Sequence, residues 1–358
     1  MQLPDVCIAG AGIIGLSLAL ELHQRGLRVT VLDRAQPLGE ASTAAAGMLA
    51  ASDPHNNAQV LPLASLSRSL YPQFLERLQS LSGMRVPYQT HLTLQAVPAG
   101  IHHAKNEFAP KDLTHLLAAL TPGSHHFVLL DEPSIDPRQL AEALLASVRA
   151  TTIDLRPNTP VLATSSAGNT IEVHTPNGIV ITKQFVDCTG AWASSTSTLP
   201  TVQVYPNKGH MLAVSLPFSL PLRIVVRTTD IYIVPRTSGR NAGQVLIGAT
   251  VEDVGFDKTV HPANITHLRS LAAQLLPPLA HAPQIETWAG LRPATPDGLP
   301  LLGALPNRPN YFVAAGHYRD GILLAPATAR VMAQLLLNEG PSIDIAPFSP
   351  TRPVTQKT

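Results

Sequence analysis

The sequence predicts an α/β fold in which a Rossmann-like nucleotide-binding domain is interleaved with a second domain rich in antiparallel strands. Three observations support this prediction. A buried strand, a glycine-rich turn and an apolar helix open the chain at residues 5–22. Short strands separated by turn residues dominate residues 204–291. The chain then returns to one buried strand at 311–315 and one long helix at 320–337, as an α/β domain completed by a distant segment would.

The opening turn, residues 10–15, has the glycine spacing of a dinucleotide site. Gly10 permits a tight turn, Gly12 has no Cβ to keep a pyrophosphate away, and Gly15 lets the helix pack closely on the strand. Glycines that serve packing alone are the alternative. A second strand, 28–33, ends in Asp33, about 20 residues beyond the turn, where an acid is expected to bind a ribose hydroxyl. This acid favours the dinucleotide interpretation.

The next segments alternate between helix and strand. Leu66, Leu70, Phe74 and Leu78 recur every four residues and predict a helix within 57–81. Asp136 followed by proline predicts a helix start. The other elements expected in this part are strands at 88–97, 126–130, 152–155 and 185–188, a short helix at 112–120 and a hairpin through Asn177-Gly178.

The segment 204–291 is predicted to form antiparallel β-structure. We expect strands at 211–214, 223–226, 231–234, 245–247 and 285–291. Asn264 is expected to cap a helix that runs to Leu276, and residues 292–302 are expected to form a loop with proline and glycine.

Composition excludes several classes of protein. The 358 residues carry 25 Lys and Arg against 24 Asp and Glu, so the net charge of +1 gives no reason to expect nucleic acid or an anionic membrane as a partner. The two cysteines offer no disulfide framework, and no apolar run approaches the roughly 18–20 residues of a membrane helix. With no basic segment at the N-terminus, we expect a cytoplasmic protein.

Metal binding is not expected either. The chain has fourteen histidines, and two pairs of them are adjacent, at 102–103 and 125–126. Adjacent side chains on a strand point to opposite faces, so neither pair would converge on one ion. No Cys/His ligand spacing is present.

Seven blocks together resemble the FAD-dependent D-amino-acid oxidase family, and within it the glycine oxidases of thiamine biosynthesis. The blocks follow the order of the family along nearly the whole chain, at residues 9–15, 44–50, 188–192, 232–236, 247–253, 288–293 and 316–326. The two blocks that hold Arg292 and Arg319 are the specific ones. The resemblance implies a D-amino-acid oxidase-like fold and FAD bound without a covalent link.

The resemblance also implies a domain division and a cofactor site. The FAD-binding domain would comprise residues 1–82, 133–205 and 293–358, and the substrate-binding domain residues 83–132 and 206–292. Residues 42–49 would line the diphosphate and flavin, Val161 would meet the adenine through its backbone, and residues 317–322 would place N–H groups near the flavin. The implied cofactor-binding residues are Gly10, Gly12, Ile14, Gly15, Asp33, Arg34, Ser42, Thr43, Ala46, Gly47, Met48, Val161, Thr189, Gly190, Trp192, His317, Tyr318, Arg319, Asp320, Gly321 and Ile322.

Amino-acid oxidation requires few protein groups, because the flavin is the electron sink. A bidentate arginine for the substrate carboxylate and a phenol beside it are the useful side chains. By the resemblance, Arg292 is the clamp, Tyr232 donates to the same carboxylate, and Arg319 lies at the pocket mouth or in direct contact. Met48 either faces the flavin or the substrate, or it fills a gap in the core.

Several functions are compatible with these residues. The first is an oxidase of glycine, N-methylglycine or small D-amino acids that forms an imine and reduces O₂ to hydrogen peroxide. The second is a dehydrogenase that passes electrons to a quinone or carrier, and the third is a tRNA-modifying oxidase, which the near-zero net charge disfavours. Substrate size is left open, because one methyl group is worth only about 1–3 kcal/mol. The family suggests a homo-oligomer, a tetramer above all.

Overall fold

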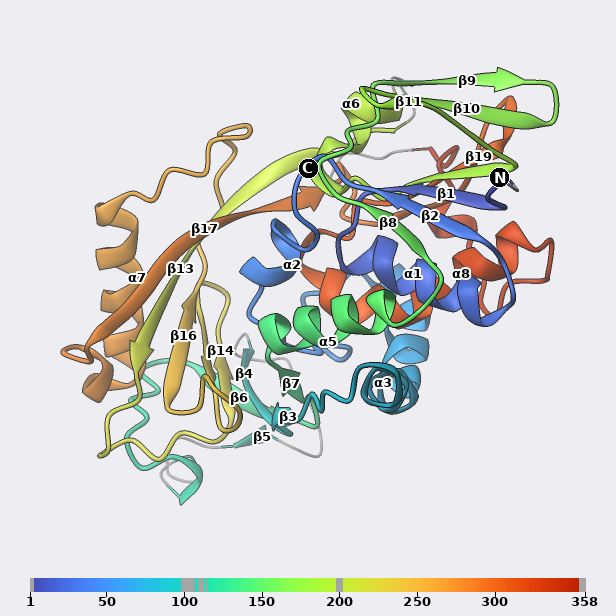
Figure 1. The fold of residues 1–358 in the computed structure, drawn as a ribbon. Coiled ribbons are helices and arrows are strands. Elements are labelled where there is room, and N and C mark those ends of the chain that lie inside the picture. Colours follow the sequence, from blue (N-terminus) through green and yellow to red (C-terminus); the bar gives the residue numbers. More distant parts are fainter. Residues whose placement is uncertain (1–2, 98–106, 109–112, 114, 198–201, 354–358) are drawn as a thin grey trace.

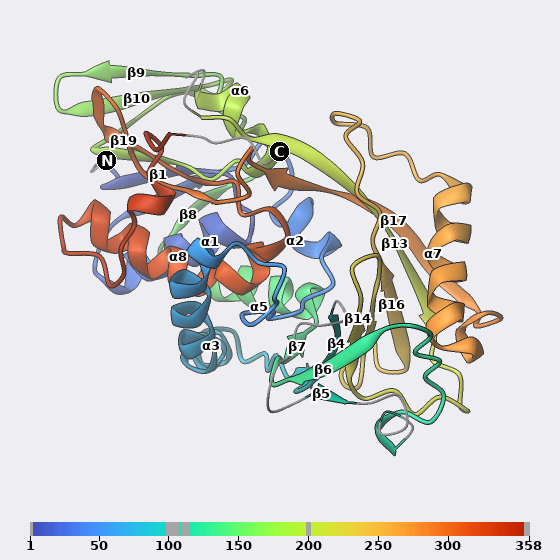
Figure 2. The same cartoon turned by 180° about the vertical axis from the view of Figure 1, so that it is seen from behind.

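The computed structural model describes residues 3–97, 107–108, 113, 115–197 and 202–353. Two large sheets dominate it (Figure 1), a mostly parallel one near both labelled termini and a mostly antiparallel one that α7 (Pro262–Leu275) covers on the outside. The long strands β13 (Tyr205–Ser215) and β17 (Gln284–Ala294) extend from beside the first sheet into the second, as both views show (Figure 2).

The first sheet has six strands, of which all neighbours but one pair are parallel. Its order is β18 (Leu301–Leu305), β19 (Arg308–Ala315), β12 (Gln184–Asp187), β1 (Val6–Ala9), β2 (Val29–Leu32) and β8 (Asp154–Arg156). A three-stranded sheet covers one face, with β9 (Ala163–Ala167), β10 (Thr170–Thr175) and β11 (Gly178–Thr182). Burial on both faces explains why β1 is a continuous apolar run and why β2 contains only one polar residue, Thr30.

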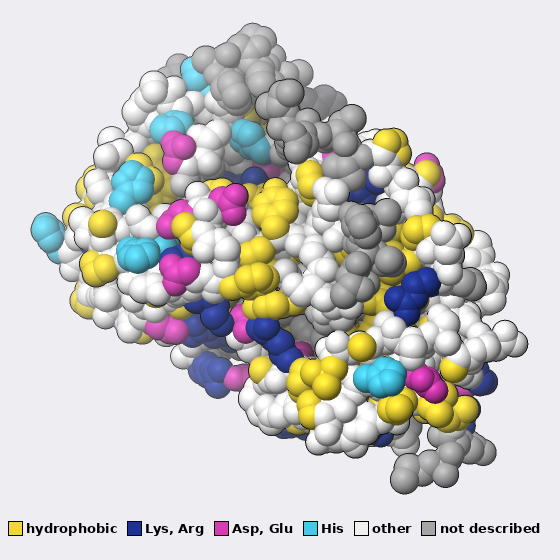
Figure 3. All heavy atoms as spheres, turned by 90° about the horizontal axis from the view of Figure 1, so that it is seen from above, with side chains coloured by type: hydrophobic (Ala, Val, Ile, Leu, Met, Phe, Trp, Pro, Cys, Tyr) yellow, Lys and Arg dark blue, Asp and Glu magenta, His cyan; other side chains and the backbone are white. Residues whose placement is uncertain are grey.

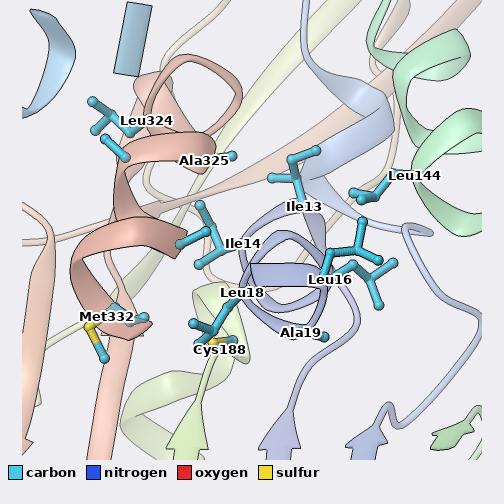
Figure 4. Close-up of a cluster of buried hydrophobic side chains, with 14 of the residues drawn as sticks. Ile13, Ile14, Leu16, Leu18, Ala19, Leu144, Cys188, Leu324, Ala325 and Met332 are labelled. Atoms are coloured by element: carbon cyan, nitrogen blue, oxygen red, sulfur yellow. The ribbon is translucent and has the colours of Figure 1, made fainter. Parts of the chain in front are cut away.

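Helices cover the other face of this sheet. They are α1 (Ile13–Gln24), α3 (Leu61–Ser82), α5 (Pro137–Arg149) and α8 (Gly321–Leu336). Ile14 and Leu18 of α1 lie in one apolar cluster with Leu144 of α5 and Met332 of α8 (Figure 4). This cluster fixes the two ends of the chain together, so the opening turn lies beside a helix that begins some 300 residues later.

The second sheet has eight strands. Its order is β17, β13, β16 (Gln244–Gly248), β15 (Tyr232–Pro235), β14 (Val225–Arg227), β4 (Thr93–Val97), β6 (His126–Leu130) and β5 (Glu107–Phe108). Smaller elements are β3 (Tyr88–Thr90), β7 (Ser134–Ile135), α2 (Ala41–Ala44), α6 (Ala193–Ser197) and 3₁₀ turns at Ala58–Val60, Gly190–Trp192, Pro277–Leu279, Tyr318–Asp320 and Ala346–Phe348.

The predicted α/β fold is confirmed, and three local predictions are wrong. The expected strand at 88–97 is two strands, β3 and β4. Asn264 does not cap α7, because the helix begins earlier, at Pro262, after His261. Arg292 lies within β17 and not in a loop, because β17 stays paired with β13 as far as Ala294. The expected helix at 112–120 falls partly outside the described residues. The division into two domains stays a prediction.

Two expectations about membranes and metals concern the described part of the chain. None of its helices is long and apolar enough to cross a membrane. The described residues contain no group of three His, Cys, Asp or Glu side chains that could hold a metal ion. His102 and His103 lie outside these residues. Cys7 and Cys188 are both buried and free.

Candidate active site

One cavity of about 330 Å³ is bounded by elements of both large sheets. Segments far apart in the sequence form its wall. They are the opening turn at 12–14, the small-residue segment 41–50, strands β13, β15 and β17, and the start of α8 at 317–322. The sequence blocks that resemble the oxidase family therefore lie around one space.

The three glycines of the opening turn are required for different reasons. Gly10 has a φ of +100°, and a Cβ there would lie 2.4 Å from the carbonyl oxygen of Cys188. A Cβ on Gly15 would lie 2.0 Å from the carbonyl oxygen of Gly10. A Cβ on Gly12, by contrast, would meet only Ser42 Oγ at 3.4 Å. Gly10 and Gly15 are needed by the fold, whereas Gly12 leaves room at the cavity wall for a ligand.

Two polar side chains already bind the N–H groups of this turn. Asp33 Oδ2 accepts from Ala11 at 2.6 Å, and Ser42 Oγ accepts from Ile13 at 2.9 Å. Burial raises the pKa of the Asp33 carboxyl above its ordinary value. Gly12 itself is the N-cap of α1, so the positive end of that helix faces the cavity. This arrangement fits a pyrophosphate.

Arg34 and Trp192, both predicted to bind the cofactor, are in contact. The guanidinium carbon of Arg34 lies 3.4 Å from the centre of the Trp192 ring. Phe256 stacks on the same ring with a centroid separation of 5.1 Å. The stack joins the loop after β2 to the loop before α7.

Close packing and hydrogen bonds hold the small-residue segment 41–50 in place. Gly47 has a φ of +84°, and a Cβ there would lie 2.1 Å from the carbonyl oxygen of Ile135. Trp288 Nε1 donates to the carbonyl of Ala44 at 3.0 Å, and Arg236 Nη2 donates to the carbonyl of Ala46 at 2.8 Å. These contacts place Ala46, Gly47 and Met48 on the cavity wall.

The start of α8 closes the cavity on another side. His317 is buried and bonds through Nε2 to Thr328 Oγ1 at 3.0 Å, and burial lowers its pKa to about 3, so the ring is neutral near pH 7. Tyr318 has a φ of +48°. Asp320 is the N-cap of α8, and residues 317–322 all line the cavity.

The predicted substrate groups lie on the same wall. Arg292 Nη1 donates to the carbonyls of Thr250 at 3.1 Å and Lys208 at 3.3 Å, and its guanidinium lies against Gly209. Tyr232 is near enough that the Arg292 guanidinium lowers the pKa of the phenol, although burial raises it overall. Arg319 also lines the cavity, and its positive charge likewise lowers the pKa of the Tyr232 phenol against the effect of burial. A cationic fork with a phenol beside it suits a carboxylate.

Some predicted cofactor residues do not line the cavity. Thr43 Oγ1 donates to the carbonyl of Leu38, and Thr189 Oγ1 donates to Asp187 Oδ1, so both support the local fold in this structure. Val161 packs against the cluster beside β10. Gly190, next to Thr189, does reach the wall. The cofactor roles of all these residues stay predictions.

Sequence reasoning missed a buried ionic cluster at the cavity. Arg227 Nη2 donates to Glu132 at 2.9 Å, and Arg227 Nε lies 3.6 Å from Asp53. Glu132 also accepts from the N–H of Ser52 at 2.7 Å. The three charged side chains are at most 6% exposed. No local sequence pattern indicates this cluster; in the structure, Arg227 pairs with Tyr232 across two neighbouring strands of the sheet.

Gly209 offers a test of the arginine clamp. A Cβ at this position would lie 2.4 Å from Arg292 Nη2, the mobile end of a side chain, so Gly209→Ala should displace the guanidinium without unfolding the chain. We expect the KM for an amino-acid substrate to rise about tenfold or more. Steady-state kinetics and thermal melting check this. An unchanged KM would mean that Arg292 does not hold the substrate.

Asp320 gives a pH-dependent prediction. Burial raises the pKa of its carboxyl from 3.8 to about 7. Between these values the folded protein keeps a proton that the unfolded chain has released, so stability should fall as the pH rises through this range. Melting temperatures of flavin-free protein should therefore fall less steeply in Asp320→Asn than in the parent. Identical slopes would contradict the assignment.

The comparisons with known proteins agree with this site. The chain matches the FAD dependent oxidoreductase (DAO) family over residues 5–335. The chain belongs to this family. It is 32% identical to the glycine oxidase of Geobacillus kaustophilus, covering 97% of both chains. The crystal structure of glycine oxidase from that organism superposes with a TM-score of 0.91, covering 99% of this chain and 100% of the other.

A second group of relatives is longer than this chain. It is 37% identical to the bifunctional protein ThiO/ThiG of Trichormus variabilis, over 94% of this chain but 53% of that protein. The chain thus spans about half the length of these bifunctional relatives. FAD is the cofactor of the family, and the turn at Gly12, the segment 44–48 and the start of α8 are the parts of the cavity that fit it.

Proposed function

We propose that this protein oxidises glycine, and with it small D-amino acids or N-methylglycine, to the imine, which hydrolyses to a 2-oxo acid and ammonia, or methylamine in the case of N-methylglycine, while O₂ is reduced to hydrogen peroxide. The observation that carries the proposal is the position of Arg292 and Tyr232 on the wall of the cavity that Gly12 and α8 also line. The glycine oxidase relatives with full-length coverage support the choice of substrate.

The protein's own groups bind and orient the substrate. Arg292 and Tyr232 would hold the carboxylate, with Arg319 at the same wall. Bound FAD supplies the acceptor for the hydride that leaves Cα. The start of α8, with neutral His317 behind it, presents the positive end of a helix to the cavity and would stabilise negative charge there. A substrate that arrives with a neutral amine requires no base from the protein.

The cellular role and the assembly belong to the same proposal. The similarity to ThiO/ThiG proteins supports a role in thiamine biosynthesis, where the imine of glycine would enter thiazole formation. We further propose a cytoplasmic homo-oligomer, a tetramer above all, that acts on a small molecule and binds neither nucleic acid nor membrane. The near-zero net charge is in keeping with this.

A substrate panel tests the proposal. The flavin-loaded protein would be incubated in air with glycine, N-methylglycine, proline and alanine, both enantiomers of the chiral ones, and peroxide and ammonia would be measured. We expect both products in equal amounts from glycine, and none from the L-amino acids. Absence of peroxide from every compound would refute the oxidase assignment.

A further inference from the structure

A polar network lies directly behind the arginine clamp, on the α7 side of β13. Its centre is His210, which is fully buried, with Thr250 and Glu252 from the segment after β16. Figure 3 shows histidine and acidic side chains interspersed on the side of the molecule where Figure 1 places α7. Neither the glycine turn nor the predicted site residues include this network.

The hydrogen bonds of His210 assign its tautomer. The backbone N–H of His261 donates to His210 Nε2 at 3.1 Å, so Nε2 must act as the acceptor and carry no proton. The proton of the neutral ring is therefore on Nδ1, which lies 2.8 Å from Glu252 Oε1. His210 is thus oriented by one donor and one acceptor on opposite sides of the ring.

Thr250 connects this network to the clamp. Its hydroxyl accepts from the backbone N–H of His210 at 2.9 Å and donates to Glu252 Oε1 at 2.6 Å. Its carbonyl oxygen accepts from Arg292 Nη1 at 3.1 Å. The side chain of Thr250 is therefore fixed by His210 and Glu252, while its backbone binds the guanidinium.

The second carbonyl that binds Arg292 is held by the same segment. Lys208 accepts from Arg292 Nη1 at 3.3 Å, and its backbone exchanges two hydrogen bonds with Glu252, at 2.9 and 3.0 Å. The side chain of Lys208 is fully buried and pairs with Asp257 at 3.1 Å. Glu252 thus contacts the residues that supply both carbonyls, Thr250 through its carboxylate and Lys208 through its backbone.

We propose that Glu252, His210 and Thr250 are positioning residues of the substrate clamp. Their side chains fix Thr250, and with it the Thr250 carbonyl, so that Arg292 keeps Nη1 engaged on the protein side and its fork is aimed at the substrate carboxylate. The inference rests on the proposed function, because it needs Arg292 to bind that carboxylate. Its physical basis is that a guanidinium loses affinity when it is free to rotate, even if its charge stays in the pocket.

Glu252 is the residue to test, because its side chain is partly exposed and its loss leaves His210 Nδ1 with the Thr250 hydroxyl at 3.0 Å. For the flavin-loaded protein, we expect Glu252→Ala to raise the KM for glycine about tenfold and to leave kcat within about twofold. Glu252→Gln keeps an acceptor oxygen and should recover most of the affinity. Glu172→Ala is the matched control, since Glu172 also pairs with a histidine, His174, but on β10, away from the cavity.

The outcomes separate this inference from the proposed function. Unchanged glycine KM in Glu252→Ala, together with a large rise in Arg292→Ala, would overturn the positioning role and leave the function intact. Unchanged KM in both variants would refute the clamp itself. Loss of bound flavin and a lower melting temperature in Glu252→Ala, with no recovery in Glu252→Gln, would show a structural role only and would also overturn the inference.

Discussion

Replacing Arg292 by Ala is expected to cost roughly 2–4 kcal/mol of substrate binding, because a charge-assisted clamp is lost. This corresponds to a rise of about thirtyfold to a thousandfold in the KM for glycine. Bound FAD should be retained, since Arg292 Nη1 donates to Asn207 Oδ1 at 3.4 Å and to the carbonyls of Thr250 and Lys208, and not to the glycine turn. Steady-state kinetics and the flavin spectrum of the purified variant measure the two effects separately.

Two further variants make this test specific. Arg292→Lys keeps the charge but not the planar fork, and should fall between the parent and the alanine variant. Arg240 is exposed and paired with Glu142, so Arg240→Ala should leave the kinetics unchanged. If the glycine kinetics of Arg292→Ala equalled those of the parent, the assignment of the substrate site would be wrong.

The second large effect is expected at Gly12. A methyl group there meets only Ser42 Oγ at 3.4 Å, so the protein itself should tolerate Gly12→Ala. The added methyl group would, however, clash with a pyrophosphate that approaches the backbone at this position. Overpacking of this kind costs about 1–3 kcal/mol. We therefore expect FAD affinity to fall about tenfold to a hundredfold while the melting temperature of the flavin-free protein stays the same. Titration of flavin-free protein with FAD measures the affinity.

Gly15 and Gly26 provide the comparison for Gly12. Gly15→Ala should prevent normal folding, because its Cβ would lie 2.0 Å from the Gly10 carbonyl oxygen. Gly26 has a φ of +82° but open space around it, so Gly26→Ala should lower stability by about 1 kcal/mol and leave FAD affinity unaltered. Equal FAD affinity in Gly12→Ala and the parent would place the cofactor elsewhere.

Local patterns were enough to predict much of this fold. The glycine turn predicted β1 and α1, the Asp136-Pro137 pair predicted the start of α5, and Asn177-Gly178 predicted the β10–β11 hairpin. In each case residues close in sequence determine the element, through a turn, a cap or a strand pair. The resemblance to the oxidase family then supplied the segments around the cavity.

Contacts between distant segments could not be predicted in this way. Arg227, Glu132 and Asp53 come from three separate parts of the chain, and none of them has a local pattern that indicates a partner. The strand β17 extends through Arg292 because β13 pairs with it as far as Ala294. The proline and glycine residues of 292–302 predict a loop and give no sign of this pairing. His210 likewise acquires its role only when Glu252 and His261 fold against it.

The most direct test of the account is the anaerobic addition of glycine to the flavin-loaded protein. We predict that the visible absorbance band of oxidised flavin disappears, that admission of air restores it, and that hydrogen peroxide forms in proportion. The same titration with Arg292→Ala should require a far higher glycine concentration. A band that persists in glycine, or a reduced flavin that stays reduced in air, would contradict the assignment of this protein as a glycine-oxidising, oxygen-dependent enzyme.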